Sequence, residues 1–258
     1  DLEDDKPHAA LLHGVTGSGK TVVFLKLIER TLELGRRALV LVPEISLTPQ
    51  MIHRLKSTFG SRLAVQHSAL NNTERLLQWR MIQQGNADIV VGTRSAVFSP
   101  LQNLGLIIVD EEQEHTYQSE SAPRYDAHDI AKKRAVMENA LLVFASATPL
   151  TETYHAAQSG KLKLVTLTQR YGGCPLPSVD FIDMRAELTA GNPREVSRRL
   201  ARELQENLDN GEQSILLLNR RGYRTIGMCT DCGHVLKCPN CSVPLVYHKP
   251  QQALMCHH

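Results

Sequence analysis

The residues of this chain best suited to chemistry lie in a glycine-rich stretch, "GVTGSGKT", which runs from Gly14 to Thr21. It matches the pattern G-x-x-x-x-G-K-[ST] in full, and it follows an apolar run and opens a helical pattern. Glycines at this spacing let successive backbone N–H groups face inward and bind phosphate oxygens at a helix N-terminus. The sequence therefore predicts a loop that binds ATP through Gly14, Thr16, Gly17, Ser18, Gly19, Lys20 and Thr21. Lys20 is expected to reach the terminal phosphates, and the Thr21 hydroxyl to ligate Mg²⁺.

A second stretch, "LIIVDEEQE", places Asp110, Glu111, Glu112 and Glu114 directly after an apolar run. Like charges this close repel one another, so a cation or solvent must offset them. Taken alone, the stretch is typical of a solvated acidic turn. Paired with the phosphate loop, it predicts that Asp110 holds Mg²⁺ at the end of a buried strand and that Glu111 polarises the attacking water. The predicted catalytic residues are Lys20, Asp110 and Glu111, while Glu112 and Glu114 are expected in an exposed turn.

Other predicted strands also end in small hydroxylic residues. Two of these ends, in "LVPEISLTPQ" and "VVGTRSAVFSP", offer donors for the phosphates of a single nucleic-acid strand, namely Thr48, Thr93, Arg94 and Ser95. Ordinary helix N-capping is the alternative interpretation, because Ser46 or Thr48 and Ser95 are suitable caps. A further strand ends in "FASATP", where Ser146 and Thr148 are placed to sense loss of the terminal phosphate of ATP.

Five of the six cysteines follow the spacing C-x₂-C-x₅-C-x₂-C-x₁₄-C near one end of the chain. Clustering of this kind indicates metal binding more than a disulfide scaffold, because each C-x₂-C pair can supply two thiolates to Zn²⁺. The two pairs are close in sequence for sharing one metal. We therefore predict one zinc on Cys238, Cys241 and Cys256, with a fourth ligand expected past the last residue or from one of the final histidines. Cys229 and Cys232 are expected to belong to a second zinc.

The chemistry-bearing residues must be positioned by the elements between which they lie. Short apolar runs alternate with helical patterns, which predicts an α/β fold with a parallel sheet covered on both faces. Strands are expected at residues 9–13, 37–43, 63–67, 87–93, 104–110, 141–148, 163–168, 179–184 and 214–219. Helices are expected at residues 20–34, 47–59, 73–84, 127–138 and 196–210.

Net charge and the lengths of the apolar runs limit the classes of protein to which the chain can belong. The chain has 258 residues, 42% of them hydrophobic, and a formal net charge of +2, which neither demands nor excludes a nucleic-acid partner. No apolar run reaches the ~18 residues of a membrane span, so a cytoplasmic protein without a membrane partner is expected. The chain starts at "DLEDD" without Met and ends at "MCHH", which indicates a piece of a larger protein.

Three regions are expected from the changes in pattern. A Gly- and Pro-rich stretch without periodicity, "QRYGGCPLPS", indicates a linker between two lobes. The predicted regions are an ATP-binding lobe at 1–174, the incomplete start of a second lobe at 175–226, and an incomplete zinc-binding Cys-rich region at 227–258.

The order of the motifs (phosphate loop, "TP" strand end, "GTR", "DEE" and "SAT") resembles the superfamily-two helicases, whose lobes are RecA-like. The stretches "HSAL", "GTRSAVFSP", "VDEEQEHTYQSESAPRYDAHDIA" and "SATPLTETYHAAQSGK" resemble the PriA family of primosomal replication-restart helicases more narrowly. The resemblance implies ATP-driven 3′-to-5′ unwinding of DNA at stalled forks. It also implies forked and single-stranded DNA, primosome and single-strand-binding proteins as partners, and two zinc ions bound by eight cysteines in the full-length protein.

In the PriA family a loop after the acidic box couples ATP turnover to single-stranded DNA, and here that loop is "EHTYQSESAPRY". By this resemblance Tyr117 and Tyr125 offer stacking faces and Arg124 a cationic plane; alternatively, Tyr125 packs beneath the helix that begins near Ala127. The chain departs from the family's D-E-E-H box at Gln113, which leaves the coupling role of that position open.

Two other functions fit the same residues. One is a related translocase on double-stranded DNA or RNA, and the other is a zinc-dependent docking module without turnover. The arginines that the second lobe of a two-lobe motor supplies to hydrolysis are absent from this sequence, so the chain by itself is expected to bind nucleotide with negligible turnover.

Overall fold

The fold was analysed in a computed structural model that describes residues 8–43, 49–173, 175, 177–192, 194, 196–217, 229, 232, 234–248 and 253–256. Contacts along the chain divide it into two compact units, Asp1–Leu176 and Pro177–His258. The first unit contains every predicted nucleotide-binding residue, and the second contains the clustered cysteines.

The first unit is built on a seven-stranded sheet in the order β3-β4-β2-β5-β6-β1-β7. All neighbouring strands are parallel, as the sequence predicts. The strands are β1 (His8–Gly14), β2 (Arg37–Leu41), β3 (Leu63–Gln66), β4 (Ile89–Gly92), β5 (Leu104–Asp110), β6 (Leu141–Ser146) and β7 (Lys163–Leu167). Parallel pairing requires crossover connections between the strands, and these are largely helical.

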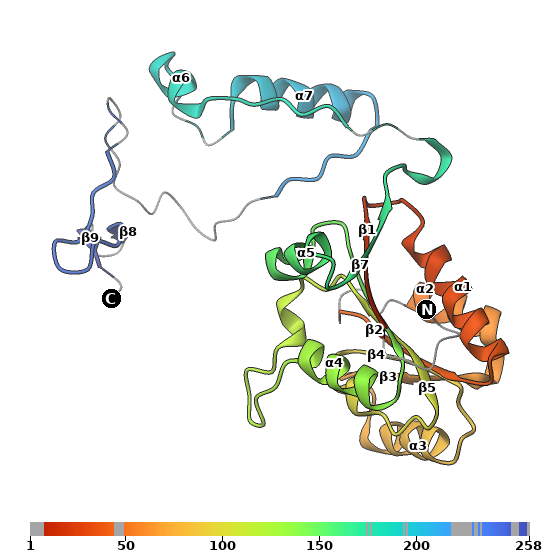
Figure 1. The fold of residues 1–258 in the computed structure, drawn as a ribbon. Helices are drawn as coiled ribbons and strands as arrows, with labels where there is room; N and C mark the ends of the chain where they lie inside the picture. Colours follow the sequence, from red (N-terminus) through yellow and green to blue (C-terminus); the bar gives the residue numbers. More distant parts are fainter. Residues whose placement is uncertain are drawn as a thin grey trace. The chain divides into compact units, whose positions relative to one another are not determined.

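Helices cover both faces of this sheet (Figure 1). The α-helices of the unit are α1 (Lys20–Glu33), α2 (Pro49–Phe59), α3 (Asn72–Gln83), α4 (Ala127–Met137) and α5 (Thr151–Gln158). Short 3₁₀ helices are η2 (Gly60–Arg62), η3 (Arg94–Phe98), η4 (His115–Tyr117) and η5 (Tyr171–Gly173). The resulting three-layer architecture confirms the predicted α/β, RecA-like class.

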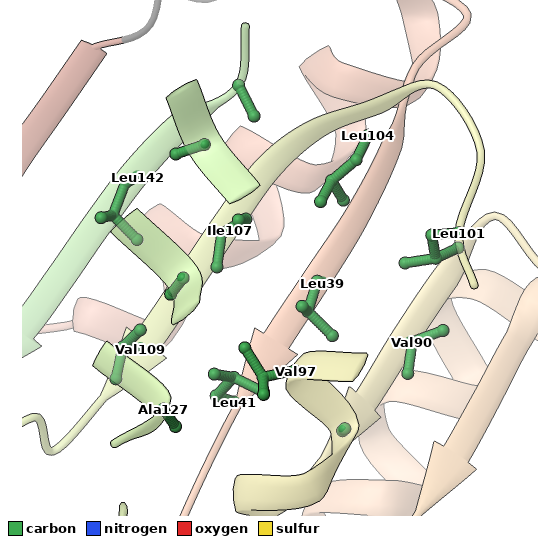
Figure 2. Close-up of a cluster of buried hydrophobic side chains, with 14 of the residues drawn as sticks. Leu39, Leu41, Val90, Val97, Leu101, Leu104, Ile107, Val109, Ala127 and Leu142 are labelled. Carbon is green, nitrogen blue, oxygen red and sulfur yellow. The ribbon is translucent and has the colours of Figure 1, made fainter. Parts of the chain in front are cut away.

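Two buried clusters hold the layers together, one on each face. Side chains of β5 alternate between them, because successive residues of a strand point to opposite faces. Leu106 and Ile108 pack with residues of α1 and α2. Ile107 and Val109 pack with η3, α4 and neighbouring strands, as Figure 2 shows. Burial on both sides explains why β5 is apolar without alternation.

The predicted strands and α-helices of this unit are confirmed with small shifts at their ends, and one α-helix was not predicted. Helix α5 begins in "PLTETYHAAQ", where Leu150 at the N-cap supplies no side-chain hydrogen bond. Because the segment lacks a local capping side chain, no start signal precedes it in the sequence.

The second unit contains α6 (Met184–Thr189), α7 (Arg198–Asp209) and an antiparallel pair of strands, β8 (Val246–His248) and β9 (Ala253–Met255). The strand predicted at residues 179–184 is wrong. Asp183 instead caps α6 by accepting a hydrogen bond from the Arg185 N–H at 2.9 Å.

The described part of the strand predicted at residues 214–219, which is 214–217, is not a strand either. Phe181 and Ile215, from the two failed predictions, are 94% and 98% exposed. Among the described residues of this unit, the only paired strands are β8 and β9. An extended segment without a neighbouring strand leaves its backbone groups unpaired and gains little stability.

No helix in the described part of the chain is long and apolar enough to span a membrane.

Gly92, at the end of β4, is required by close packing. A Cβ atom at this position would press against the backbone carbonyl oxygen of Gln66 and the methyl group of Ala96.

We therefore expect Gly92→Ala to lower the free energy of unfolding by about 1–3 kcal/mol, the usual cost of overpacking a tight site. Urea denaturation of this variant beside the wild-type chain measures the difference, and an unchanged free energy of unfolding would contradict the packing argument.

Candidate active site

The strand order brings the predicted chemical residues to one edge of the sheet. Strand β6 lies between β1 and β5, with His13 opposite Ser146 and Asp110 opposite Ala145. Because parallel strands end at the same edge, the loop after β1, the end of β6 and the acids after β5 are neighbours. In open α/β sheets, ligands bind at the edge formed by the carboxyl ends of the strands.

The phosphate loop has the curled backbone that its glycines permit. Gly17 and Gly19 adopt φ angles of 79° and 90°, and the Ser18 N–H donates to the Val15 carbonyl oxygen at 3.0 Å. The buried Ser18 hydroxyl oxygen has no hydrogen-bond partner among the described residues. Thr16, Gly17 and Thr21 are exposed, so the mouth of the loop is open to a ligand. An orphaned hydroxyl beside open N–H groups fits a site for an anion.

Lys20 is held between the loop and the acids. Its Nζ donates to the Gly14 carbonyl oxygen at 2.9 Å and lies 3.9 Å from Glu111 Oε1. The side chain is only 11% exposed. The structure therefore brings Lys20 and Glu111 together, as the sequence predicts. A buried cation with one neutral acceptor and one distant carboxylate is well placed to bind further negative charge.

Asp110 is the carboxylate most affected by its surroundings. Burial, with the negative charge of Glu111, raises the pKa of Asp110 to about 6, although the Glu111 N–H and Lys20 act in the opposite direction. Glu111 itself adopts φ 45°, a left-handed conformation that is costly for a residue with a side chain. Its N–H donates to Asp110 Oδ1 at 3.0 Å. The arrangement fits a divalent cation, which would offset the repulsion between the two acids.

Gln113 connects the acids to the end of β6. Its Nε2 donates to Glu111 Oε2 at 3.0 Å, and its Oε1 accepts from the Ser146 hydroxyl at 2.5 Å. The Thr148 N–H in turn donates to the Ser146 oxygen at 2.8 Å. Ser146 is fully buried, whereas Thr148 is exposed. Gln113 therefore connects Ser146 to Glu111.

Glu112 is not in an exposed turn, so that prediction is wrong. The residue is fully buried, and its two carboxylate oxygens accept from the Leu150 N–H at 2.7 Å and from the Thr153 hydroxyl at 3.1 Å. It thus supplies the capping group that the start of α5 lacks. His128 Nε2 lies 2.9 Å from the Glu112 carbonyl oxygen. Reasoning from sequence missed this role because the partner residues lie far along the chain.

Tyr117 is not a stacking face, which corrects a second expectation. It is fully buried, and its hydroxyl donates to the Asp110 carbonyl oxygen at 2.6 Å. Burial, with the nearby carboxylates, raises the pKa of Tyr117 far above its usual range, so the hydroxyl stays a donor. Tyr125 is half-buried and packs against the cluster that contains Ala127, in line with the packing alternative. Arg124 is exposed.

A pocket of about 780 Å³ lies at the ends of β2, β3 and β4, beside the segment that follows the acids. Thr93, Arg94 and Ser95 all line it. Arg94 Nη1 donates to the Thr116 carbonyl oxygen at 3.3 Å and to that of Gln118 at 2.5 Å. Thr48 lies outside the described residues.

Three of the predicted metal ligands meet in the second unit. The sulfur atoms of Cys238, Cys241 and Cys256 all lie within 4.8 Å of one another. Backbone N–H groups of Asn240 and Cys241 lower the pKa of Cys238 to about 7, which favours the thiolate. Among the described residues, this group does not include Cys229 or Cys232. Three converging thiolates in this arrangement fit Zn²⁺.

Comparison with known proteins identifies the class. Residues 4–156 match the DEAD/DEAH box helicase family. The crystallised helicase domain of Pyrococcus furiosus Hef shares the fold, with a TM-score of 0.50 and 15% identity over 82% of this chain and 53% of that chain. The chain belongs to the DEAD/DEAH box helicase family.

Within that class the relatives are more specific. The chain is 48% identical over 257 residues to replication restart protein PriA of Bacillus subtilis, covering 100% of this chain and 32% of the relative. It is 45% identical over 260 residues to PriA of Synechocystis sp., covering 97% of this chain and 31% of that protein. Residues 238–258 match the PriA DNA helicase Cys-rich region domain. The chain is a PriA-family sequence that spans about a third of the length of these relatives.

Because the pKa of Asp110 is raised in the folded chain, the free energy of unfolding should depend on pH. Its ordinary value of 3.8 applies to the unfolded chain, so between pH 3.8 and about 6 the folded chain binds more protons. The contribution of Asp110 to the free energy of unfolding is therefore fully present below pH 3.8 and is lost as the pH rises through about 6. In metal-free buffer at pH 7, Asp110→Asn should raise the free energy of unfolding by about 1–2 kcal/mol.

Denaturant titrations of both chains from pH 4 to pH 7.5 measure this, and the difference should disappear near pH 4. Asp129→Asn, at an exposed position of α4, serves as the control. A variant that is less stable than wild type at pH 7 would show that Asp110 does not carry an unfavourable buried charge.

Proposed function

We propose that this chain is the nucleotide-binding part of an ATP-dependent DNA helicase that unwinds DNA 3′ to 5′ at stalled forks and promotes replication restart. The observation that carries the proposal is the position of Lys20, buried between the phosphate loop and Glu111, next to a partly desolvated Asp110. A docking module without turnover has no use for a largely buried lysine beside two crowded carboxylates. The family membership supports the choice of DNA as substrate.

Different residues of the site bind the phosphates of ATP, the Mg²⁺ ion and the attacking water. Backbone N–H groups of Gly14, Thr16, Gly17 and Gly19 and the Ser18 hydroxyl hold the phosphate oxygens, and Lys20 leaves the Gly14 carbonyl oxygen to contact the terminal phosphates. Thr21 and Asp110 hold Mg²⁺, which neutralises charge on the phosphates when bound. Glu111 orients and polarises the attacking water.

Thr148 and Ser146 respond to the terminal phosphate through Gln113, which contacts both Ser146 and Glu111. This bridge supports a sensing role for a glutamine at the position where the family pattern has histidine. An amide can donate to one neighbour and accept from the other at once, as Gln113 does here.

Single-stranded DNA binds at the pocket on the neighbouring strand ends. Thr93, Arg94 and Ser95 contact its phosphates. The segment that follows the acids joins this pocket to the nucleotide edge, because Tyr117 contacts Asp110 while Thr116 and Gln118 accept from Arg94. Coupling of DNA binding to ATP turnover passes through this segment, and not through a stacking Tyr117.

The Cys-rich region holds Zn²⁺ on Cys238, Cys241 and Cys256, and Cys229 and Cys232 contribute to a second zinc in the full-length protein. The metal organises a surface for DNA, primosome proteins or single-strand-binding proteins. The residues 1–174, 175–226 and 227–258 form the first helicase lobe, part of the second lobe and the zinc region.

The ATPase assignment is tested by Lys20→Ala in the full-length protein that carries this segment. The change removes the cation expected on the phosphates and should lower DNA-stimulated ATPase by roughly 10²-fold or more. Lys26→Ala, at an exposed position of the same helix, is the matched control and should keep full activity. This chain by itself should bind nucleotide with negligible turnover.

Survival of replication restart in Lys20→Ala would favour the docking-module function instead. ATPase stimulated by RNA duplexes but not by forked DNA would identify an RNA translocase. Robust DNA-stimulated ATPase from this chain alone would show that no arginine from elsewhere is needed.

The zinc assignment is tested by replacing the metal with Co²⁺, whose thiolate complexes absorb visibly. Cys238→Ser, Cys241→Ser and Cys256→Ser should each weaken the Co²⁺–thiolate absorption, because each removes a ligand from one tetrahedral site. Ser242→Ala, beside the cluster, should leave it unchanged. Unaltered spectra in all three cysteine variants would rule out this ligand set.

A further inference from the structure

The pocket at the ends of β3 and β4 has a second wall that the proposed phosphate contacts do not use. Helix α3 and the turn before it supply His67, Ser68, Arg75 and Trp79 to this wall. The volume of about 780 Å³ falls in the range of sites that enclose small organic ligands. The pocket therefore has room for the base of a nucleotide as well as its phosphate.

Trp79 is the unusual member of this wall. An indole ring is normally buried for the most part, yet Trp79 is 39% exposed. It stands four residues after Arg75 on α3, so the two side chains share one face of the helix. The start of this helix is fixed by a capping box, in which Asn71 and Glu74 each bind the other's backbone N–H at 2.9 Å. The ring is thus carried by an anchored element.

The polar groups around the ring suit a nucleotide. Arg75 and Arg94 bring positive charge to the pocket, and Glu120 is the one carboxylate among the residues that line it. Arg94 Nε is buried and has no hydrogen-bond partner among the described residues. An aromatic face next to cationic and hydroxyl groups is the combination that binds unpaired nucleotides, with the base stacked and the phosphate neutralised.

We propose that Trp79 stacks against one unpaired base of the single-stranded DNA whose phosphates contact Thr93, Arg94 and Ser95. This inference rests on the proposed function and adds a base-contacting residue to it. Stacking tolerates any base, so the contact grips single-stranded DNA without selecting a sequence. In a duplex the base faces are covered by their neighbours, so the same contact favours unpaired over paired DNA.

A protein partner fits the observations less well. Leu76 and Leu77 on the same helix are 49% and 58% exposed, but neither lines the pocket. An apolar docking face would centre on them, whereas Trp79 lies among arginines and hydroxyl groups.

The chain offers a direct readout, because Trp79 is its only tryptophan. Titration of the 258-residue chain with oligo(dT) should quench its tryptophan fluorescence as the base stacks. Trp79→Ala should weaken oligo(dT) binding, measured by fluorescence anisotropy of a labelled strand, by about 10-fold, and Trp79→Phe by about 3-fold or less. Leu77→Ala, exposed on the same helix, is the matched control and should bind as wild type does.

An abasic site moved along an oligo(dT) just long enough to bind separates base contact from general effects, because such a short strand has one register on the protein. At one position it should weaken binding to the wild-type chain by about the same factor as Trp79→Ala, and it should weaken binding to Trp79→Ala no further. Full affinity in Trp79→Ala, together with weak binding in Arg94→Ala, would overturn the stacking contact while keeping the phosphate site. Absence of oligo(dT) binding by the wild-type chain would instead contradict the proposed DNA function.

Discussion

The placement of β6 between β1 and β5 is the constraint on which the site depends. Parallel pairing on both sides of β6 fixes the registers His13 to Ser146 and Asp110 to Ala145. Three chain segments far apart in sequence therefore end at one edge of the sheet, and Lys20 comes within 3.9 Å of Glu111. The buried clusters on the two faces hold this register, because a slip by one residue would exchange the side chains that face each cluster. The chemistry of the edge is thus a consequence of packing in the core.

The acidic segment after β5 contacts the start of α5 on one side and Arg94 on the other. Glu112 is buried against the start of α5, while Tyr117 donates to the carbonyl oxygen of Asp110. Arg94, at the end of β4, donates to the carbonyl oxygens on either side of Tyr117. A ligand that displaces Arg94 is therefore connected by two successive contacts to the residue expected to hold magnesium. In this arrangement the crowded acids have different surroundings, because Asp110 and Glu111 lie beside Lys20 whereas Glu112 caps the start of α5.

Most of this fold and part of the site were predictable from sequence, for identifiable reasons. The phosphate loop, the end of β5 and the Cys238–Cys241 pair are local motifs, whose backbone geometry is set by neighbours in the chain. Glu112 and Tyr117 were misjudged because their burial depends on α5 and on the sheet edge, which the local pattern does not contain. The strands expected in the second unit failed for the same reason, since a strand requires a partner, and Ile215 is 98% exposed and pairs with no strand in the described part of the chain.

The most direct test of the account is the structure of this chain with Mg²⁺ and a non-hydrolysable ATP analogue. We expect Lys20 Nζ to leave the Gly14 carbonyl oxygen, which it contacts at 2.9 Å in this structure, and to bind the terminal phosphates. We also expect a metal ion bound by Thr21 and Asp110, with Glu111 facing the terminal phosphate. A nucleotide bound elsewhere, or a Lys20 that stays on Gly14 while the loop is occupied, would contradict it.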